Sequence, residues 1–149
     1  MVYDTLLQYV TDASQKSMTC IIAADVNASV GERREYDCEK TIGLHGVGSW
    51  NERGEMFVNW ATLHDFSICN THFGGSPSDL WTYSWNNTCR ELDYFLVDHK
   101  HFRLVLNCLV DTNIDIGSDH RLVRLNFKLD MQHKHYQSAA KRVPRWRVD

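Results

Sequence analysis

Residues 91–97 read Glu-Leu-Asp-Tyr-Phe-Leu-Val, an apolar and β-prone run with an aspartate, Asp93, inside it. The run predicts a strand, and the alternating sequence of residues 82–85, Thr-Tyr-Ser-Trp, predicts another before it. Asn86-Asn87 is a turn signal, so we expect these two strands to form a hairpin. A buried carboxylate is costly without a partner. Asp93 therefore requires a cation or a hydrogen-bond donor from elsewhere in the chain.

Two further strands are predicted downstream, over residues 104–110 and 122–129. Residues 117–120, Gly-Ser-Asp-His, come directly before the second of them. Asp119 and His120 are thus expected on a loop that leads into a strand, where a rigid sheet can aim them into a cleft. A plain Ser/Asp turn before a strand is the alternative explanation of this tetrapeptide.

The segment upstream begins with apolar residues at helical spacing, which predict an amphipathic helix over residues 2–16. Residues 18–24 are apolar and β-prone, and they are followed by Asp25 and Asn27. This pattern predicts a buried strand that delivers both polar side chains at its C-terminal end. An Asp-x-Asn sequence after a strand is also commonly a turn.

The middle of the chain contains a glycine-rich stretch, Gly-Leu-His-Gly-Val-Gly, at residues 43–48. It lacks the Lys-Ser/Thr of a P-loop, so a structural loop is favoured over a phosphate-binding loop. Asn51 is placed to cap a helix that runs to about His64, and residues 66–71 predict a short strand. Two helices with five or six strands indicate an α+β or α/β layered sheet protein.

The composition is that of a folded single domain, with 149 residues of which 43% are hydrophobic. No apolar run approaches the roughly 18 residues needed to span a bilayer. The first residues have neither the basic nor the apolar region of a signal peptide, which favours an intracellular protein, nuclear or cytoplasmic. Five cysteines without a C-x-x-C pair argue against a disulfide scaffold and a zinc ribbon.

Charge is unevenly distributed along the chain. Residues 131–149 hold five basic residues against one acid, a net charge of +4. Since the whole chain has a net charge of −3, the first 130 residues have a net charge of −7. We therefore expect a domain over residues 1–130 and a basic linker or tail over 131–149, in which Arg145 and Trp146 are candidate nucleic-acid contacts. An acidic body does not indicate nucleic-acid binding by its net charge, so phosphate contacts would need local groups or a metal.

Three chain segments bring five polar residues to predicted strand ends. They are Asp25, Asn27, Asp93, Asp119 and His120. Each has an ordinary structural explanation, but together they match what phosphodiester hydrolysis requires. An imidazole held by a carboxylate is a positioned cationic donor, and Mg²⁺ takes oxygen ligands while keeping several waters.

Three segments closely resemble the endonuclease/exonuclease/phosphatase superfamily. They are residues 21–28 (IIAADVNA), 91–97 (ELDYFLV) and 117–123 (GSDHRLV). Members of that superfamily include apurinic/apyrimidinic endonucleases, deoxyribonuclease I and the endonuclease domains of LINE-type retrotransposons. Residues 43–73 resemble its LINE-type and craniofacial-development-protein-like branch.

The resemblance implies a role for each site residue. Asp25 would orient or deprotonate the attacking water, and Asn27 would hold the scissile phosphate. Asp119 would be a carboxylate of the metal site, for Mg²⁺ or Mn²⁺. His120 would donate to the phosphate, and Asp93 would pair with His120.

The resemblance also implies a DNA substrate and a two-sheet α/β sandwich. Tyr83 and Trp85 fall where related endonucleases carry a DNA-facing hairpin, although both are equally well explained as core aromatics. Nothing in residues 1–24 matches the asparagine and metal-binding glutamate of the family's N-terminal half. We therefore expect only about the C-terminal half of the sandwich, with an open strand edge and the other half supplied in cis or by a second chain.

The function expected from the sequence is divalent-metal-dependent hydrolysis of DNA phosphodiesters, of the retroelement endonuclease type, by an incomplete domain. Whether this chain is active alone stays open. The alternatives are a non-catalytic remnant that binds nucleic acid or protein, and a phosphatase of the same superfamily.

Overall fold

The computed structural model describes residues 2–129, which form two α-helices and seven strands. The helices are α1 (Val2–Gln15) and α2 (Glu52–Leu63). The strands are β1 (Ile21–Asp25), β2 (Phe66–Ile68), β3 (Tyr83–Trp85), β4 (Thr88–Arg90), β5 (Asp93–Asp98), β6 (Val105–Asp111) and β7 (Leu122–Phe127). Short 3-10 helices cover Cys69–His72, Pro77–Asp79 and Phe102–Leu104.

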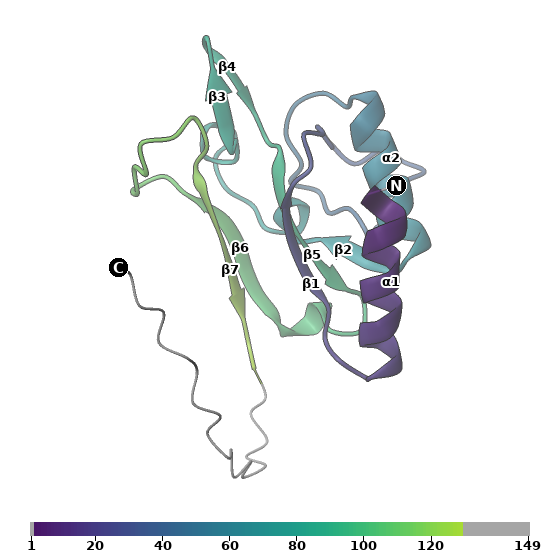
Figure 1. Ribbon diagram of the computed structural model, residues 1–149. Coiled ribbons are helices and arrows are strands. Elements are labelled where there is room, and N and C mark those ends of the chain that lie inside the picture. The colour runs from purple at the N-terminus through teal and green to yellow at the C-terminus, as the bar shows by residue number, and fades with distance from the viewer. Residues whose placement is uncertain (1, 130–149) are drawn as a thin grey trace, which may run out of the picture.

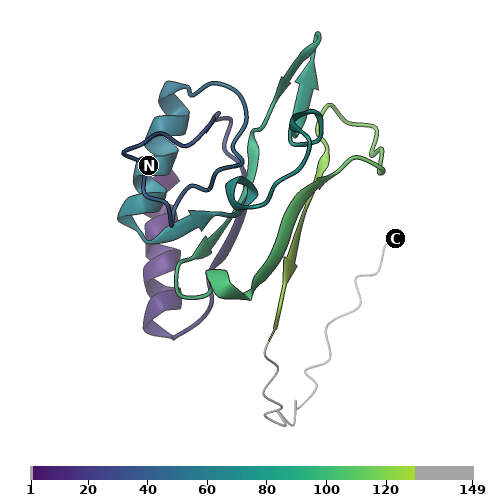
Figure 2. The same cartoon turned by 180° about the vertical axis from the view of Figure 1, so that it is seen from behind.

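These elements stack in three layers (Figures 1 and 2). The middle layer is an antiparallel sheet in the order β1-β5-β2, and both helices lie on one of its faces. The antiparallel pair β6-β7 lies on the other face, and the β3-β4 pair projects from one end of the molecule. In the described part of the chain, neither helix has the length and apolar character needed to cross a lipid bilayer. The architecture is an α+β sandwich, as the sequence predicts.

Strand β5 contributes to the core on both of its faces. Tyr94 and Leu96 pack into the cluster between the sheet and the helices, and each is 1% exposed. Phe95 and Val97 belong to the cluster shared with β6 and β7. Because alternate side chains point to opposite faces of a strand, a strand buried on both faces must be apolar throughout. This accounts for the continuous apolar run of residues 91–97.

The hairpin predicted between residues 82–85 and 91–97 is wrong. Strand β3 pairs with β4, with Tyr83 opposite Arg90 and Trp85 opposite Thr88. Asn86 and Asn87 both have positive φ, of 46° and 61°, so they form a two-residue turn and the chain returns at once. Residues 93–98 pair instead with β1 and β2.

Most other elements lie close to their predicted positions. Asn51 caps α2, and its side chain accepts a 2.7 Å hydrogen bond from the N–H of Gly54. The strand predicted over residues 18–24 begins only at Ile21. The strand predicted over residues 66–71 ends at Ile68, because the chain turns there into a 3-10 helix.

Part of strand β1 is uncovered on the face of the middle sheet that is turned toward β6 and β7. Within residues 2–129 it pairs with β5 alone, so its outer edge has no neighbouring strand. Ile21 is 42% exposed, and Ala23 is exposed beside it. They lie opposite Val97 and Phe95 of β5, which belong to the cluster shared with β6 and β7. Among the described residues, β1 is therefore an edge strand of the middle sheet.

Candidate active site

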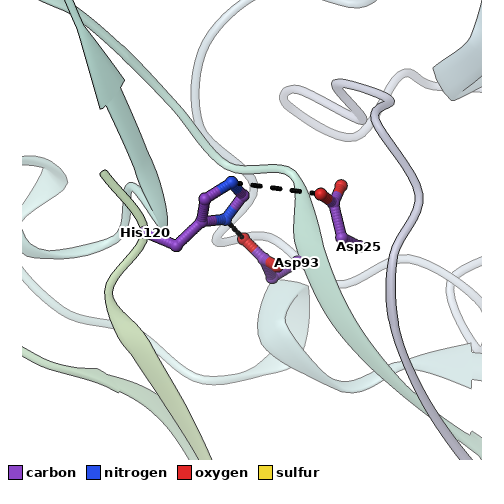
Figure 3. A group of neighbouring side chains, drawn as sticks. All are labelled: Asp25, Asp93 and His120. Atoms are coloured by element: carbon purple, nitrogen blue, oxygen red, sulfur yellow. Dashed lines mark hydrogen bonds and ion pairs between the residues drawn. The ribbon is translucent and has the colours of Figure 1, made fainter. Parts of the chain in front are cut away.

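Three of the residues singled out in the sequence meet at one end of the middle sheet. Asp25 ends β1 and Asp93 begins β5, and the antiparallel register sets them opposite each other. His120 reaches them from the loop before β7. Figure 3 shows its imidazole between the two carboxylates.

The two ring nitrogens of His120 face different acids. Nδ1 lies 2.8 Å from Oδ2 of Asp93, which is a hydrogen bond. Nε2 lies 3.9 Å from Oδ2 of Asp25, which is too long for one. Since the Asp93 carboxylate is an acceptor, Nδ1 carries the proton. The donor that the half-buried Asp93 requires is thus His120, as the resemblance implies, and Nε2 is left facing Asp25.

Two residues that sequence reasoning missed hold Asp93 in place. Thr82 is fully buried, and its Oγ1 accepts from the N–H groups of Leu92, at 2.9 Å, and Asp93, at 3.1 Å. The Nδ2 of Asn70 donates to the carbonyl of Asp93 at 3.0 Å. No local motif marks either residue, since each acts on a segment that is distant in sequence.

His120 is positioned by the β3 strand. Tyr83 and His120 form an isolated antiparallel bridge, and their rings lie 5.1 Å apart in a tilted arrangement. The N–H of Arg121 donates to the carbonyl of Thr82 at 2.7 Å, and that of Ser84 donates to the carbonyl of Asp119 at 2.9 Å. The loop that carries the histidine is therefore fastened to the β3-β4 pair and to β5.

Asp25 is oriented by the turn that follows β1. Its Oδ1 accepts a 2.9 Å hydrogen bond from the N–H of Asn27, whose φ is 47°. This is an Asx-type turn, in which asparagine tolerates the left-handed backbone. The Asp25 side chain is 50% exposed, and its second oxygen, Oδ2, lies on the side of His120.

A cleft of about 540 Å³ joins most of the predicted site residues. Its lining includes Asp25, Asn27, Tyr83, Trp85 and His120. Arg90 also lines it, and sequence reasoning did not select that residue. Arg90 is the last residue of β4, a strand that the sequence analysis did not predict.

Two of the predicted site residues, Asp93 and Asp119, do not line this cleft. Asp119 is exposed and lines a neighbouring pocket of about 300 Å³ instead. The carboxylates of Asp25 and Asp93 and the ring of His120 offer ligand atoms within 4.8 Å of one another, and Asp119 is not part of that group. Arg145 and Trp146 lie outside the described residues.

The environment favours a protonated imidazole. The hydrogen bond to Asp93 raises the pKa of His120, and the negative charges of Asp93, Asp25 and Asp119 raise it further, against a smaller opposing effect of burial. The side chain is 28% exposed, so solvent screens part of this effect. In its protonated form the imidazole presents a positively charged N–H to an anion in the cleft.

We expect Asp93→Asn to lower the pKa of His120, because the variant loses the carboxylate that stabilises the imidazolium. Because the folded state binds this proton more tightly than the unfolded state, the raised pKa stabilises the folded protein. The stabilisation is complete at pH values below the ordinary imidazole pKa of about 6.5, and it is lost as the pH rises through the raised pKa. The stability gap between wild type and variant should therefore be wider at about pH 6 than at about pH 9. NMR titration of the imidazole and urea unfolding at both pH values measure the two effects. Asp98→Asn, at the other end of β5, should leave the titration of His120 unchanged.

Comparison with known proteins places this arrangement in context. No protein-family model matches the chain. It is 26% identical over 128 residues to Craniofacial development protein 2 of Tragulus javanicus and of Bos taurus. The match covers 85% of this chain but only 22% and 21% of those proteins, so the chain spans about a fifth of the length of the curated relatives it matches.

A solved structure shares the fold. The chain matches the endonuclease domain of TRAS1, a telomere-specific non-LTR retrotransposon, with a TM-score of 0.53 and 14% sequence identity. The match covers 85% of this chain and 52% of that one. At this identity the likeness concerns the fold.

Proposed function

We propose that this chain, which has an endonuclease/exonuclease/phosphatase-like fold, holds a divalent-metal-dependent site that hydrolyses DNA phosphodiesters. One observation carries the proposal. The imidazole of His120 is fixed by Asp93 through Nδ1 while Nε2 faces Asp25, and His120 and Asp25 both line the cleft. This is the arrangement expected of a cationic donor aimed at a phosphate.

The roles follow from which atoms face the cleft. Protonated His120 would donate from Nε2 to a non-bridging phosphate oxygen and stabilise the charge that develops there. Asp25, with Oδ1 held by its turn and Oδ2 facing His120, would orient the attacking water or accept its proton. Asn27 lines the same cleft, where its amide would hold the phosphate. Asp93 is a positioning residue that acts through His120.

The donor set fits Mg²⁺ or Mn²⁺. Both cations prefer oxygen ligands, and Mg²⁺ is commonly bound by one or two carboxylates together with substrate phosphates. The exposed carboxylate of Asp25 would hold the ion directly, because Oδ2 of Asp93 is already engaged by His120. Asp119, which lines the neighbouring pocket, would contribute through water. When bound, such an ion neutralises negative charge on the phosphate.

The walls of the cleft favour a nucleic-acid substrate. Trp85 is 60% exposed, and Tyr83 and Arg90 lie in the same lining. Exposed aromatic rings stack on bases, and an arginine pairs with phosphate oxygens. The name of the structural neighbour, an endonuclease domain, agrees with this substrate class.

Conversion of supercoiled plasmid to the nicked form tests the proposal. We expect nicking with Mg²⁺ or Mn²⁺ and none with EDTA, because the phosphate charge must be neutralised. Wild-type protein that is folded yet inactive with both metals would refute it. DNA binding without cleavage would then favour the interaction-fragment alternative, whereas release of phosphate from a monoester would favour the phosphatase.

A further inference from the structure

A second pocket, of about 590 Å³, lies apart from the cleft and is lined mainly by basic side chains. They are Arg33, Lys40 and Arg103, together with His45, His72 and His99. No residue of this pocket lines the cleft that holds His120. His99 follows the last residue of β5, whereas Asp93 is the first, and a strand of six residues spans roughly 17 Å.

The charge of this pocket is opposite to that of the chain around it. Its three permanent cations face one acid, Glu39, although the first 130 residues carry −7. The neighbouring Arg34, by comparison, forms ion pairs with Asp37 and Glu55.

By contrast, within residues 2–129 the side chains of Arg33, Lys40 and Arg103 form no hydrogen bond and no ion pair. A cluster of uncompensated cations on an acidic body is selective for anions.

The histidines add hydrogen-bonding capacity to the cationic wall. Nε2 of His99 is buried and has no hydrogen-bond partner among the described residues, while its Nδ1 faces Asp65 at 3.6 Å. Burial lowers the pKa of the neighbouring His72, and the charges of Arg33 and His99 lower it further. A buried ring nitrogen without a partner is costly, and when Nε2 carries a proton an anionic oxygen is an acceptor for it.

The glycine-rich stretch at residues 43–48 borders this pocket without forming a phosphate loop. A side chain at Gly43 would collide with the backbone of Thr71, and one at Gly46 would collide with the carbonyl of Gly31. The N–H of Gly43 is already bonded to Oγ1 of Thr71 at 2.8 Å. Close packing therefore explains both glycines, and anion contacts in this pocket would come from side chains.

We propose that this cationic pocket, defined by Arg33, Lys40, His72, His99 and Arg103, binds phosphate groups of a nucleic-acid strand outside the catalytic cleft. The proposal rests on the proposed function for the identity of the substrate. Arginine matches phosphate geometry with its fork of donors, and lysine adds a point charge. The volume exceeds that of one phosphate group, so it accommodates a stretch of backbone. A free nucleotide offers the same chemistry, and the test separates the two sources.

Fluorescence anisotropy with a labelled DNA duplex measures this contact in EDTA, where no metal-dependent cleavage occurs. The test variant is Arg33→Ala/Lys40→Ala/Arg103→Ala. The control is Arg53→Ala/Lys16→Ala/Lys128→Ala, which removes the same charge from exposed positions outside the pocket. We expect the test variant to bind about tenfold or more weakly, with its salt slope reduced by about 2 to 3, and the control to change far less. Matching circular dichroism spectra and melting curves establish that both variants fold.

A titration with inorganic phosphate, followed through the imidazole NMR signals of His72 and His99, identifies the source of the phosphate. Loss of duplex affinity in the test variant alone supports the strand. If duplex affinity is unchanged, but phosphate causes saturable shifts of the imidazole signals that the test variant abolishes, the ligand of the pocket is a free phosphate and not a nucleic-acid strand. If both variants bind the duplex equally and phosphate does not shift the imidazole signals, the proposal that this pocket binds phosphate groups is refuted. Because the assay needs no cleavage, failure to nick plasmid would refute the proposed function and leave this result standing.

Discussion

His120→Asn is expected to lower metal-dependent nicking of plasmid DNA by about 10²- to 10⁴-fold, the range for loss of a positioned acid–base group. Asparagine retains an N–H that can reach Asp93, so the acid keeps a partner. The variant has no donor at the place of Nε2 and no positive charge, so the phosphate loses its cationic contact. Initial rates at saturating Mg²⁺ give the effect, and binding measured in EDTA should change much less.

The chain offers a closely matched control for this substitution. His101 also bonds to an aspartate through Nδ1, at 2.6 Å from Asp98, and its side chain is 28% exposed, as is that of His120. Asp98 and Asp93 occupy opposite ends of β5. His101→Asn should therefore nick DNA at the wild-type rate. Equal losses in both variants would mean that the effect comes from stability, and His120 would have no direct role.

Leu96→Ala is expected to destabilise the protein by about 2–5 kcal/mol, as truncation of a buried leucine does when the cavity cannot collapse. Leu96 is 1% exposed and lies in the middle of β5, opposite Ile22 of β1 and Ile68 of β2. Urea unfolding followed by circular dichroism measures the loss. Because folded domains are stable by only about 5–15 kcal/mol, a large part of this variant should be unfolded at 37 °C.

Leu106→Ala provides the comparison, because the same atoms are removed from a β6 residue that is 63% exposed. A change within about 0.5 kcal/mol is expected there. Similar losses at the two positions would contradict the placement of β5 as the strand that joins both core clusters.

Local sequence patterns predicted the elements whose information lies within a few residues. The spacing of apolar residues placed α1, and Asn51 placed the start of α2, because helix periodicity and capping are local properties. The apolar run at 91–97 predicted a buried strand for the same reason. The hairpin failed because strand pairing depends on the turn: the two asparagines return the chain within two residues, which leaves β5 free to pair elsewhere.

The sequence by itself determined that Asp93 needs a partner and that Asp25, Asn27 and His120 stand at strand ends. The energetic cost of a buried carboxylate and the alternation of strands are properties of short segments. The family resemblance implied that His120 is this partner, and the tertiary structure shows the hydrogen bond between them. Only the tertiary structure decided that Asp119 faces a different pocket.

The supports of the site and the cationic pocket also needed the tertiary structure. Thr82 and Asn70 act on β5 from other segments, and Arg33, Lys40 and Arg103 meet only through the packing of the 31–50 loop against the β5–β6 connection. The physical reason is that hydrogen bonds and charge clusters between distant segments depend on register and packing. No single stretch of the sequence encodes either of these.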